Sequence, residues 1–443
     1  MKKMTLIKKG EIYMARGGTR PNAGRTAIVG KEIKIKIPEN IYNDVDENFT
    51  GKTIQEKIRD CLEYGVNAWQ TKVSNISDVK YNVVDLFSGA GGLSRGFMDA
   101  GFNVVLGVDF DDAALKTFKE NHGHAEAMKL DLFDHKNIDK IHEYLEQRNI
   151  VLDVLVGGPP CQGFSLAGKR EEFDKRNVLY SAMVKTAEKL KPRVVVLENV
   201  PGMLTLYDGA GAKRVREDFE SIGYHVNEPR ILYAPEYGVP QIRKRVFFVM
   251  TLKEKVQGSF NYPEPLLEES DFITCGDAIG NLPSLVGATD YSLNQVLEYE
   301  TAPTNEYERL MRKNSSMLYN HTPTKHADET IRLISLVPEG KNYKALPKEE
   351  LEKRTFKYNE ALTRYDSTKP SRTIDTGHRT HFHYKWNRIP TVREAARLQS
   401  FPDDFIFYGN KQEQYKQVGN AVPPLLGKAV ATKVKELLDN EEH

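Results

Sequence analysis

Short apolar runs alternate with amphipathic stretches along much of the chain, and this alternation predicts its fold. The runs Val83–Phe87, Val104–Val108, Leu152–Val156 and Val194–Leu197 are dominated by apolar residues. Such runs, separated by helical patterns, are typical of strands buried on both faces of a parallel sheet. Alternating strands and helices place helices on both sides of that sheet. Residues 79–256 are therefore predicted to form a doubly wound α/β domain.

Glycines and acids follow these strands at the edge where such a sheet binds ligands. The glycine-rich turn at residues 88–92 leads from the first strand into a helix, which lets a ligand approach the backbone closely. Its glycine spacing differs from the G-x-G-x-x-G fingerprint of dinucleotide-binding folds. Asp85, Asp109 and Asp131 come at the ends of three successive strands. Each alone is equally consistent with a helix cap or a solvated strand end, but together they predict a ligand site.

Cys161 is the strongest candidate for a catalytic nucleophile. It lies in the sequence Gly-Gly-Pro-Pro-Cys-Gln-Gly-Phe-Ser of residues 157–165, directly after an apolar run. The two prolines restrict the backbone, so the thiol is held in one place. A rigidly held thiol at the end of an α/β strand suits a nucleophile, although a lone cysteine is more often a small core residue.

Three further residues are candidates for holding a substrate. Glu198 ends an apolar run, where burial can raise the pKa of a carboxyl and let it act as an acid. An ion-paired glutamate at the end of a strand is the alternative. Arg243 and Arg245 alternate into the next apolar run, so one of them should point inward. An inward arginine needs an anionic or carbonyl partner.

Taken in order, these motifs resemble those of the cytosine-5 DNA methyltransferase family over residues 81–437. Asp85-Leu86-Phe87-Ser88-Gly89-Ala90-Gly91-Gly92 resembles the family's S-adenosylmethionine loop, and Gly158-Pro159-Pro160-Cys161-Gln162 resembles its nucleophile loop. The two motifs that hold the target base are matched by Glu198-Asn199-Val200 and Gln241-x-Arg243-x-Arg245. Three further family motifs are also matched. The start of the helix after the nucleophile loop is matched by residues 176–179, a late structural helix by residues 388–399, and the last motif by residues 417–424. Asp109 departs from the family, which more often has Glu there.

The resemblance implies a mechanism and a set of ligands. Cys161 would attack carbon 6 of a flipped-out cytosine, Glu198 would bind ring nitrogen 3, Arg245 would hold O2, and Arg243 would support the site. The implied cofactor is S-adenosyl-L-methionine, and the implied substrate is double-stranded DNA. A restriction endonuclease is the implied genetic partner, and the catalytic core would act as a monomer. The implied cofactor contacts are Phe87, Gly89, Gly91, Gly92, Asp109, Phe110, Asp131, Leu132, Pro159, Leu179, Asn420 and Ala421.

The α/β pattern is interrupted over residues 257–369, which are polar and irregular. In the family this insert is the target-recognition domain, whose side chains read base edges in the major groove. Arg364 and Arg372 are candidate contacts to base edges, although a phosphate contact or a solvated surface charge is the commoner role for such a residue. Residues 370–443 are expected to return to the catalytic domain.

The N-terminal residues predict a basic flexible arm, residues 1–30, followed by a small module at residues 31–75. Residues 1–25 hold seven Lys or Arg against one acid. Isoleucines then alternate with Lys34 and Lys36 in a predicted strand, and two short helical patterns follow. This strand-helix-helix order resembles a ribbon-helix-helix module, which pairs as a dimer and contacts DNA through its strand, here through Lys34 and Lys36. We hypothesise repression of the chain's own gene; the alternative is an accessory domain packed on the core.

The composition of the chain bears on its cellular compartment and on whether it binds a metal. No apolar run approaches the roughly 20 residues that span a bilayer, and no signal peptide precedes the arm, so the protein is predicted to be cytoplasmic and nucleoid-associated. Three widely spaced cysteines predict a reducing interior without disulfides or a zinc site. The histidines at 378, 381 and 383 lack cysteine partners, so no metal is expected.

Two other functions stay open at this point. One branch of the family uses the same motifs on RNA, which makes a tRNA cytosine-5 methyltransferase the first alternative. A DNA-binding transcriptional regulator with an idle catalytic half is the second. The long insert and the N-terminal module favour DNA as the substrate, and the intact set of Cys161, Glu198 and Arg245 argues against an idle site.

Overall fold

The computed structural model describes most of the chain from residue 81 onwards and parts of the N-terminal region. The described residues are 2–8, 31–37, 42, 45–46, 53–54, 56–58, 61, 81–160, 177–205, 209–293, 295–355, 361–377 and 380–441. The chain divides into two compact units, residues 1–79 and residues 80–443.

The N-terminal unit contains a two-stranded antiparallel sheet. Strand β2 (Lys31–Ile37) is the predicted strand, and it pairs with β1 (Lys2–Lys8) in the register Lys2↔Ile37 to Lys8↔Lys31. Residues 2–8 were expected in a flexible arm, but they complete this sheet. The partner of β2 therefore lies in the same chain, whereas a ribbon-helix-helix module takes it from a second copy. Val45 and Ile58, in helical segments, form a small apolar cluster.

An eight-stranded sheet forms the centre of the second unit, with the order β5-β4-β3-β6-β7-β10-β8 and with β9 paired to β10. Strands β3 to β7 run parallel, and β10 runs antiparallel to its neighbours. Strand order reverses between β3 and β6, which creates the switch point where doubly wound sheets bind ligands. The strands are β3 (Asn82–Leu86), β4 (Asn103–Asp109), β5 (Glu126–Lys129), β6 (Val154–Gly157), β7 (Val194–Asn199), β8 (Tyr224–Val226), β9 (Arg230–Tyr233) and β10 (Lys244–Leu252).

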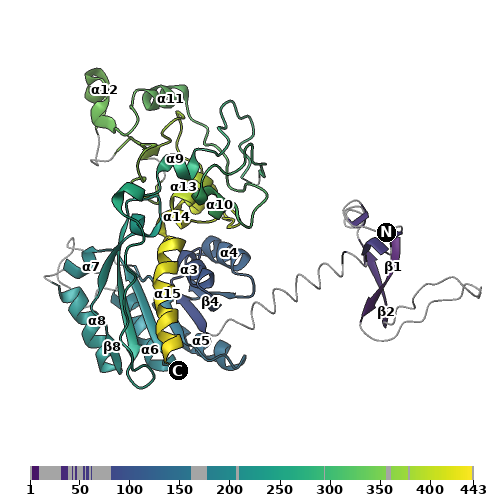
Figure 1. The fold of residues 1–443 in the computed structure, drawn as a ribbon, viewed down its shortest axis with the longest axis vertical. Helices are drawn as coiled ribbons and strands as arrows, with labels where there is room; N and C mark the ends of the chain where they lie inside the picture. The colour runs from purple at the N-terminus through teal and green to yellow at the C-terminus, as the bar shows by residue number, and fades with distance from the viewer. Residues whose placement is uncertain are drawn as a thin grey trace, which may run out of the picture. The chain divides into compact units, whose positions relative to one another are not determined.

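Helices cover both faces of this sheet, as the sequence predicts. Phe97 of α3, Phe118 of α4 and Val430 of α15 share one core with the sheet, whereas Ile141 of α5 and other residues of α6 and α8 share the core on the other face. Figure 1 shows α15 running across the first of these faces. The helices are α3 (Gly92–Asp99), α4 (Asp112–Asn121), α5 (Asn137–Glu146), α6 (Asn177–Leu190), α7 (Gly202–Thr205), α8 (Ala210–Ser221) and α15 (Pro424–Asn440).

The predicted insert forms a lobe of short helices above the sheet, with little regular strand structure (Figure 1). One apolar core of this lobe joins residues 275–318 with residues 392–418, so α13 and α14 belong to it. The C-terminal segment is thus divided, because α15 packs on the sheet. The lobe's elements are α9 (Cys275–Ile279), α10 (Glu306–Arg312), α11 (Asp328–Ser335), α12 (Lys348–Glu352), β11 (Thr363–Arg364), β12 (His381–Phe382), α13 (Val392–Leu398) and α14 (Lys411–Asn420).

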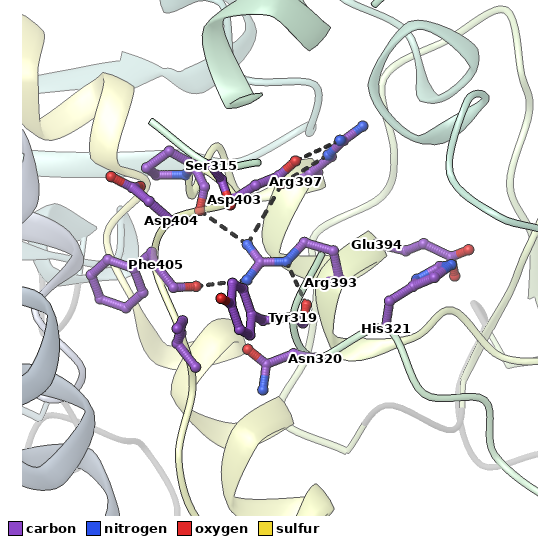
Figure 2. A network of polar contacts seen from close by, with 12 residues as sticks. Ser315, Tyr319, Asn320, His321, Arg393, Glu394, Arg397, Asp403, Asp404 and Phe405 are labelled. Atoms are coloured by element: carbon purple, nitrogen blue, oxygen red, sulfur yellow. Dashed lines mark hydrogen bonds and ion pairs between the residues drawn. The ribbon is translucent and has the colours of Figure 1, made fainter. Parts of the chain in front are cut away.

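Buried charges fix α13 inside this lobe (Figure 2). Arg397 makes a two-point ion pair with Asp403, with N–O distances of 3.0 and 2.6 Å. The Arg393 guanidinium donates to the carbonyl oxygens of Tyr319 at 2.9 Å and Phe405 at 2.7 Å. Buried charges are tolerated only when they are paired and hydrogen-bonded. The network therefore supports the structural role that the resemblance implies for this helix.

Membrane-spanning helices and metal-binding clusters are both absent from the described part of the chain. No helix there is both long enough and apolar enough to cross a membrane. Likewise, no cluster of three His, Cys, Asp or Glu side chains is placed to bind a metal among those residues. His383 is buried 3.6 Å from Glu394, and His378 lies outside the described residues.

Candidate active site

The turn after β3 has the backbone conformation of a ligand-binding loop. Phe87, Gly89 and Gly91 all have positive φ, at 59°, 54° and 92°. A side chain on Gly89 would have open space, because no described residue other than its chain neighbours has an atom within 4 Å of its Cβ position. One on Gly91 would overlap the His122 ring. Glycine therefore allows the tight turn at both positions, and at Gly89 it also leaves a backbone surface that a ligand can reach.

Asp109 at the end of β4 holds this loop in place. Its Oδ2 accepts a hydrogen bond from the Gly89 amide at 2.8 Å, and its Oδ1 accepts from the amides of Phe110 and Asp111 at 2.7 and 3.0 Å. A carboxylate has about four acceptor positions, so these bonds leave capacity for the ribose hydroxyl that the resemblance implies. Asp109 is half-buried and faces the loop.

The other two strand-end acids lie in different environments. Asp85 is buried beneath the loop, where its Oδ2 accepts from the Ser94 hydroxyl at 2.6 Å and burial raises its pKa to about 7. Asp131 is exposed, and its Oδ1 accepts from the Phe133 amide at 3.0 Å. Asp85 is thus a buried support of the loop, and Ser94 is a supporting residue that the sequence reasoning missed.

Three features of this edge fit the implied cofactor. The space at Gly89 is open. The buried Ser88 hydroxyl oxygen has no hydrogen-bond partner among the described residues, so it is available to a ligand. Phe110 and Phe133 expose 66 % and 46 % of their surfaces, and an aromatic ring exposed beside a strand end can stack on a flat heterocycle.

The C-terminal motif meets the same loop. A Cβ on Gly92 would lie 3.1 Å from that of Ala421, so the two backbones pack closely. Arg243 explains the position of this motif: its buried guanidinium donates to the carbonyl oxygens of Gly419 at 3.0 Å and Ala421 at 3.1 Å. Arg243 is therefore the inward arginine that the sequence predicts. Of the remaining predicted contacts, Leu132 and Pro159 are buried, Leu179 is half-buried and Asn420 is exposed.

Glu198 and Arg245 form an ion pair at the neighbouring strand ends. The Arg245 Nε lies 2.8 Å from Glu198 Oε1, and both side chains are largely buried. Burial raises the pKa of Glu198, while the charges of Arg245 and Arg243 act in the opposite direction. Burial also lowers the pKa of Arg243 to about 9, an effect that Arg245 reinforces. The carboxyl thus keeps its proton to a higher pH than an ordinary glutamate does.

The segment that leads to Cys161 is tied to this pair. The Asn199 side-chain amide donates to the Pro159 carbonyl oxygen at 3.0 Å, and a Cβ on Gly158 would lie 3.0 Å from Glu198 Oε2. Cys161 itself lies outside the described residues, which end at residue 160 and resume at residue 177. The start of its loop nevertheless lies against Glu198.

Gln241 belongs to a motif that the sequence analysis names, but its structural role was not predicted. Its side-chain Oε1 accepts from the Ile374 amide at 3.1 Å and from Arg243 at 3.3 Å, and its Nε2 donates to Gln399. It is fully buried and joins the arginine motif to the lobe. A polar residue two positions before a predicted inward arginine was the only available signal.

The predicted DNA contacts are placed differently from one another. Arg364 is buried, and its Nη2 donates to the Ile334 carbonyl oxygen at 2.6 Å and to Asn387 Oδ1 at 2.7 Å. We correct that prediction, because Arg364 is bound inside the lobe. Arg372 is exposed. Lys34 and Lys36 lie in β2, and nothing is described of their side chains.

Comparison with known proteins agrees with this geometry. The family model described as C-5 cytosine-specific DNA methylase matches residues 81–436. The chain is 36 % identical over 361 residues to the Type II methyltransferase M1.HphI of Haemophilus parahaemolyticus, covering 81 % of this chain and 87 % of that protein. It is 32 % identical to the Type II methyltransferase M.DdeI of Desulfomicrobium norvegicum, covering 81 % and 89 %.

A solved structure is similar over the same part of the chain. It is described as a DNA modification methyltransferase encoded within a prophage, from E. coli, and it superposes with a TM-score of 0.67 at 26 % identity. The match covers 81 % of this chain and 100 % of that chain.

Proposed function

On the premise that this chain belongs to the C-5 cytosine-specific DNA methylase family, we propose that Cys161, Glu198 and Arg245 act together on one flipped-out cytosine. The chain is a DNA (cytosine-5)-methyltransferase that uses S-adenosyl-L-methionine. The observation that carries the proposal is the contact of Gly158 and Pro159, which lead to Cys161, with Glu198 and Asn199 beside the Glu198–Arg245 ion pair.

Carbon 5 of cytosine is a poor nucleophile, and the protein residues have to activate it. The Cys161 thiolate forms a bond to carbon 6, and the electron pair released moves toward nitrogen 3 and O2 of the ring. Glu198 donates its proton or a hydrogen bond to nitrogen 3, which its raised pKa favours. Arg245 donates to O2, where negative charge also develops. Once carbon 5 carries the methyl group, nitrogen 3 returns its proton to Glu198. The carbon 5 proton then passes to solvent, the double bond between carbons 5 and 6 re-forms, and the bond from carbon 6 to sulfur breaks to release the Cys161 thiolate.

The cofactor supplies an electrophilic methyl group on a sulfonium. The residues proposed to hold it are the loop from Phe87 to Gly92, Asp109 and the 420–421 segment. Asp109 keeps the loop open by its bond to the Gly89 amide. Arg243 keeps Ala421 against Gly92 and has no contact with the base in this role.

Sequence recognition is proposed for the lobe formed from residues 257–369. Its irregular backbone and short helices suit loops that enter a groove of DNA. The M1.HphI and M.DdeI proteins are named as Type II methyltransferases. We extend that name to this chain and propose that it protects host DNA from a restriction endonuclease with the same recognition sequence.

The N-terminal unit is proposed as a second DNA contact. Its β1–β2 sheet carries Lys34 and Lys36 on β2, and the basic residues of the arm surround it in sequence. Such a unit can bind the promoter of its own gene, and because β1 of the same chain pairs with β2, this sheet needs no second copy. Full-length protein with Lys34→Gln and Lys36→Gln should lose promoter binding in a gel-shift assay but keep methylation. Unchanged promoter binding would refute this role.

The test of the catalytic proposal uses three proteins in a host without cytosine methylation. Wild type, Cys161→Ala and the control Cys61→Ala are expressed, and plasmid DNA is sequenced after bisulfite treatment. Wild type and Cys61→Ala should protect cytosines in one short motif, and Cys161→Ala should protect none. Methylation by Cys161→Ala would refute the nucleophile, and no methylation by soluble wild type would point to an RNA substrate.

A further inference from the structure

A cavity of about 460 Å³ lies beside the loop that leads into Arg243 and Arg245. Its walls come from Ile242, from residues between 340 and 345, and from residues between 363 and 372. This volume lies within the range of ligand pockets, about 300–1,000 Å³. The mechanism proposed above makes no use of it.

The walls of this cavity are strongly cationic. Five of the lining residues are Lys or Arg and one is Asp, whereas the whole chain holds 63 Lys or Arg and 62 Asp or Glu. Lys341, Lys344, Lys369 and Arg372 are exposed, so solvent and ligands can reach their charges. The one acid, Asp366, already accepts two hydrogen bonds from Thr368 and lies 3.5 Å from Lys369 Nζ. A concave surface of this charge attracts anions.

A buried hydroxyl in the wall lacks a partner. Ser371 is 1 % exposed, and its Oγ makes no hydrogen bond to any described residue. A buried polar group without a hydrogen-bond partner is unfavourable, so a ligand that accepts a hydrogen bond from the Ser371 hydroxyl is favoured. Arg364, beneath the same wall, adds a charge that is held by internal carbonyl and amide oxygens.

Hydrogen bonds join this wall directly to residues 240–242, the segment that leads into Arg243 and Arg245. The Ser371 amide donates to the Pro240 carbonyl oxygen at 2.9 Å, and the Ile242 amide donates to the Ser371 carbonyl oxygen at 2.7 Å. The Thr373 hydroxyl donates to the Ile242 carbonyl oxygen at 2.6 Å. Ile242 precedes Arg245 by three residues, which extend over roughly 10 Å at about 3.3 Å each. The cavity therefore lies a few nucleotides from a base held by Arg245.

We propose that this cavity binds a backbone phosphodiester of the DNA strand that carries the target cytosine, with Arg372 and Lys344 as its main cationic ligands. The inference rests on the proposed function, because it takes the base to be held by Glu198 and Arg245. A phosphate fits the chemistry of the walls, since lysine, arginine and serine groups are typical phosphate ligands. A phosphate bound here fixes the position of the DNA strand. The flipped-out base then reaches Glu198 and Arg245 at a fixed distance from that phosphate.

The experiment measures the salt dependence of DNA binding by full-length protein. Wild type, Arg372→Gln, Lys344→Gln and the double variant bind a fluorescent duplex containing the methylated motif found by bisulfite sequencing. Each lost phosphate contact should lower the slope of log affinity against log salt by about 0.9. Hence the ratio of wild-type affinity to that of each single variant should fall about 3.5-fold between 50 and 200 mM salt. The KM for DNA should rise while kcat at saturating DNA and the methylated motif stay those of wild type.

Lys140→Gln provides the matched control, because Lys140 is an exposed lysine on α5, outside the cavity. Slopes of the cavity variants equal to that of Lys140→Gln would overturn the proposal. A changed methylation motif in Arg372→Gln would also overturn it, because the residue would then read a base. If wild type methylates no DNA, the proposed function fails instead, and salt slopes on an unmethylated duplex still report on the cavity.

Discussion

Replacing Glu198 by Gln is the most direct perturbation of the base site. The change keeps the size of the side chain but removes the group that can give a proton to the ring. Glu198 is 8 % exposed and lies 2.8 Å from Arg245. Burial raises its pKa against the opposing effect of Arg245 and Arg243. The proton is therefore held at a pH where an ordinary glutamate has lost it.

Two separate losses should follow, and their sizes can be worked out. A positioned acid contributes about 10²- to 10⁴-fold in rate, which is roughly 3–5 kcal/mol of barrier at about 1.4 kcal/mol per tenfold. Removing one partner of a buried ion pair also costs about 3–5 kcal/mol of unfolding free energy. The Arg245 side chain is 15 % exposed, so the lower end of that range is expected.

The assay follows methyl transfer to plasmid DNA as a function of pH, together with the unfolding free energy in denaturant. Wild-type kcat should fall on the alkaline side as Glu198 loses its proton, and this fall should be absent in Glu198→Gln. Glu264→Gln is the matched control, since Glu264 pairs with Arg230 at 3.1 Å but its side chain is 79 % exposed. That control should keep wild-type kcat and lose only about 0–1 kcal/mol of stability.

The reasoning would be refuted by a Glu198→Gln protein with the kcat of the Glu264→Gln control. Cofactor binding measured on both variants shows whether each is folded, so a loss of activity through unfolding is recognised. An alkaline fall that persists in Glu198→Gln would assign it to another group.

Three further predictions test how the site is supported. Gly91→Ala should destabilise the protein strongly because its Cβ would overlap His122, whereas Gly89→Ala should cost only backbone strain of about 1–2 kcal/mol; thermal melting with and without cofactor compares them. Asp403→Asn should lower the unfolding free energy by about 3–5 kcal/mol, because it leaves buried guanidinium groups unpaired. Asp404→Asn, which removes a partly exposed pair, should lower it by only about 0–1 kcal/mol in the same denaturant titration. Stability should fall as the pH drops from about 6.5 toward 4, because burial lowers the pKa of three histidines to about 4. In this range the unfolded chain binds protons that the folded chain does not. A melting temperature that is constant over this range would contradict the account. These histidines are His122, His321 and His383.

The parallel part of the sheet could be predicted because buried strands need continuous apolar residues. The run Val194–Leu197 became the core of β7, all of whose residues are buried, and Val104–Val108 became the core of β4. Strands β8 and β9 gave no such signal, since they are three and four residues long and each has an exposed position. Their antiparallel pairing with β10 depends on tertiary contacts that a local pattern does not contain.

Charges were harder to assign from sequence than apolar runs. The alternation of Arg243 and Arg245 into a buried strand predicted that one of them needs an internal acceptor, and the structure supplies the carbonyl oxygens of Gly419 and Ala421 to Arg243. The need was local, but the partners lie 176 and 178 residues away. Arg364 was misread for the converse reason, because a count of cations does not distinguish a surface charge from one bound to internal carbonyls.

The buried polar contacts of the site hold protein segments to one another. Asn199 fixes the start of the Cys161 loop, Arg243 fixes the last motif against the cofactor loop, and Gln241 fixes the arginine motif to the lobe. Each of these contacts forms within the protein itself, so substrate binding need not order it. Catalysis gains from donors that are already aimed where charge develops, because no reorganisation is then required. The distribution of these contacts therefore predicts that cofactor and base enter a preformed site, and that base flipping is the main rearrangement required for turnover.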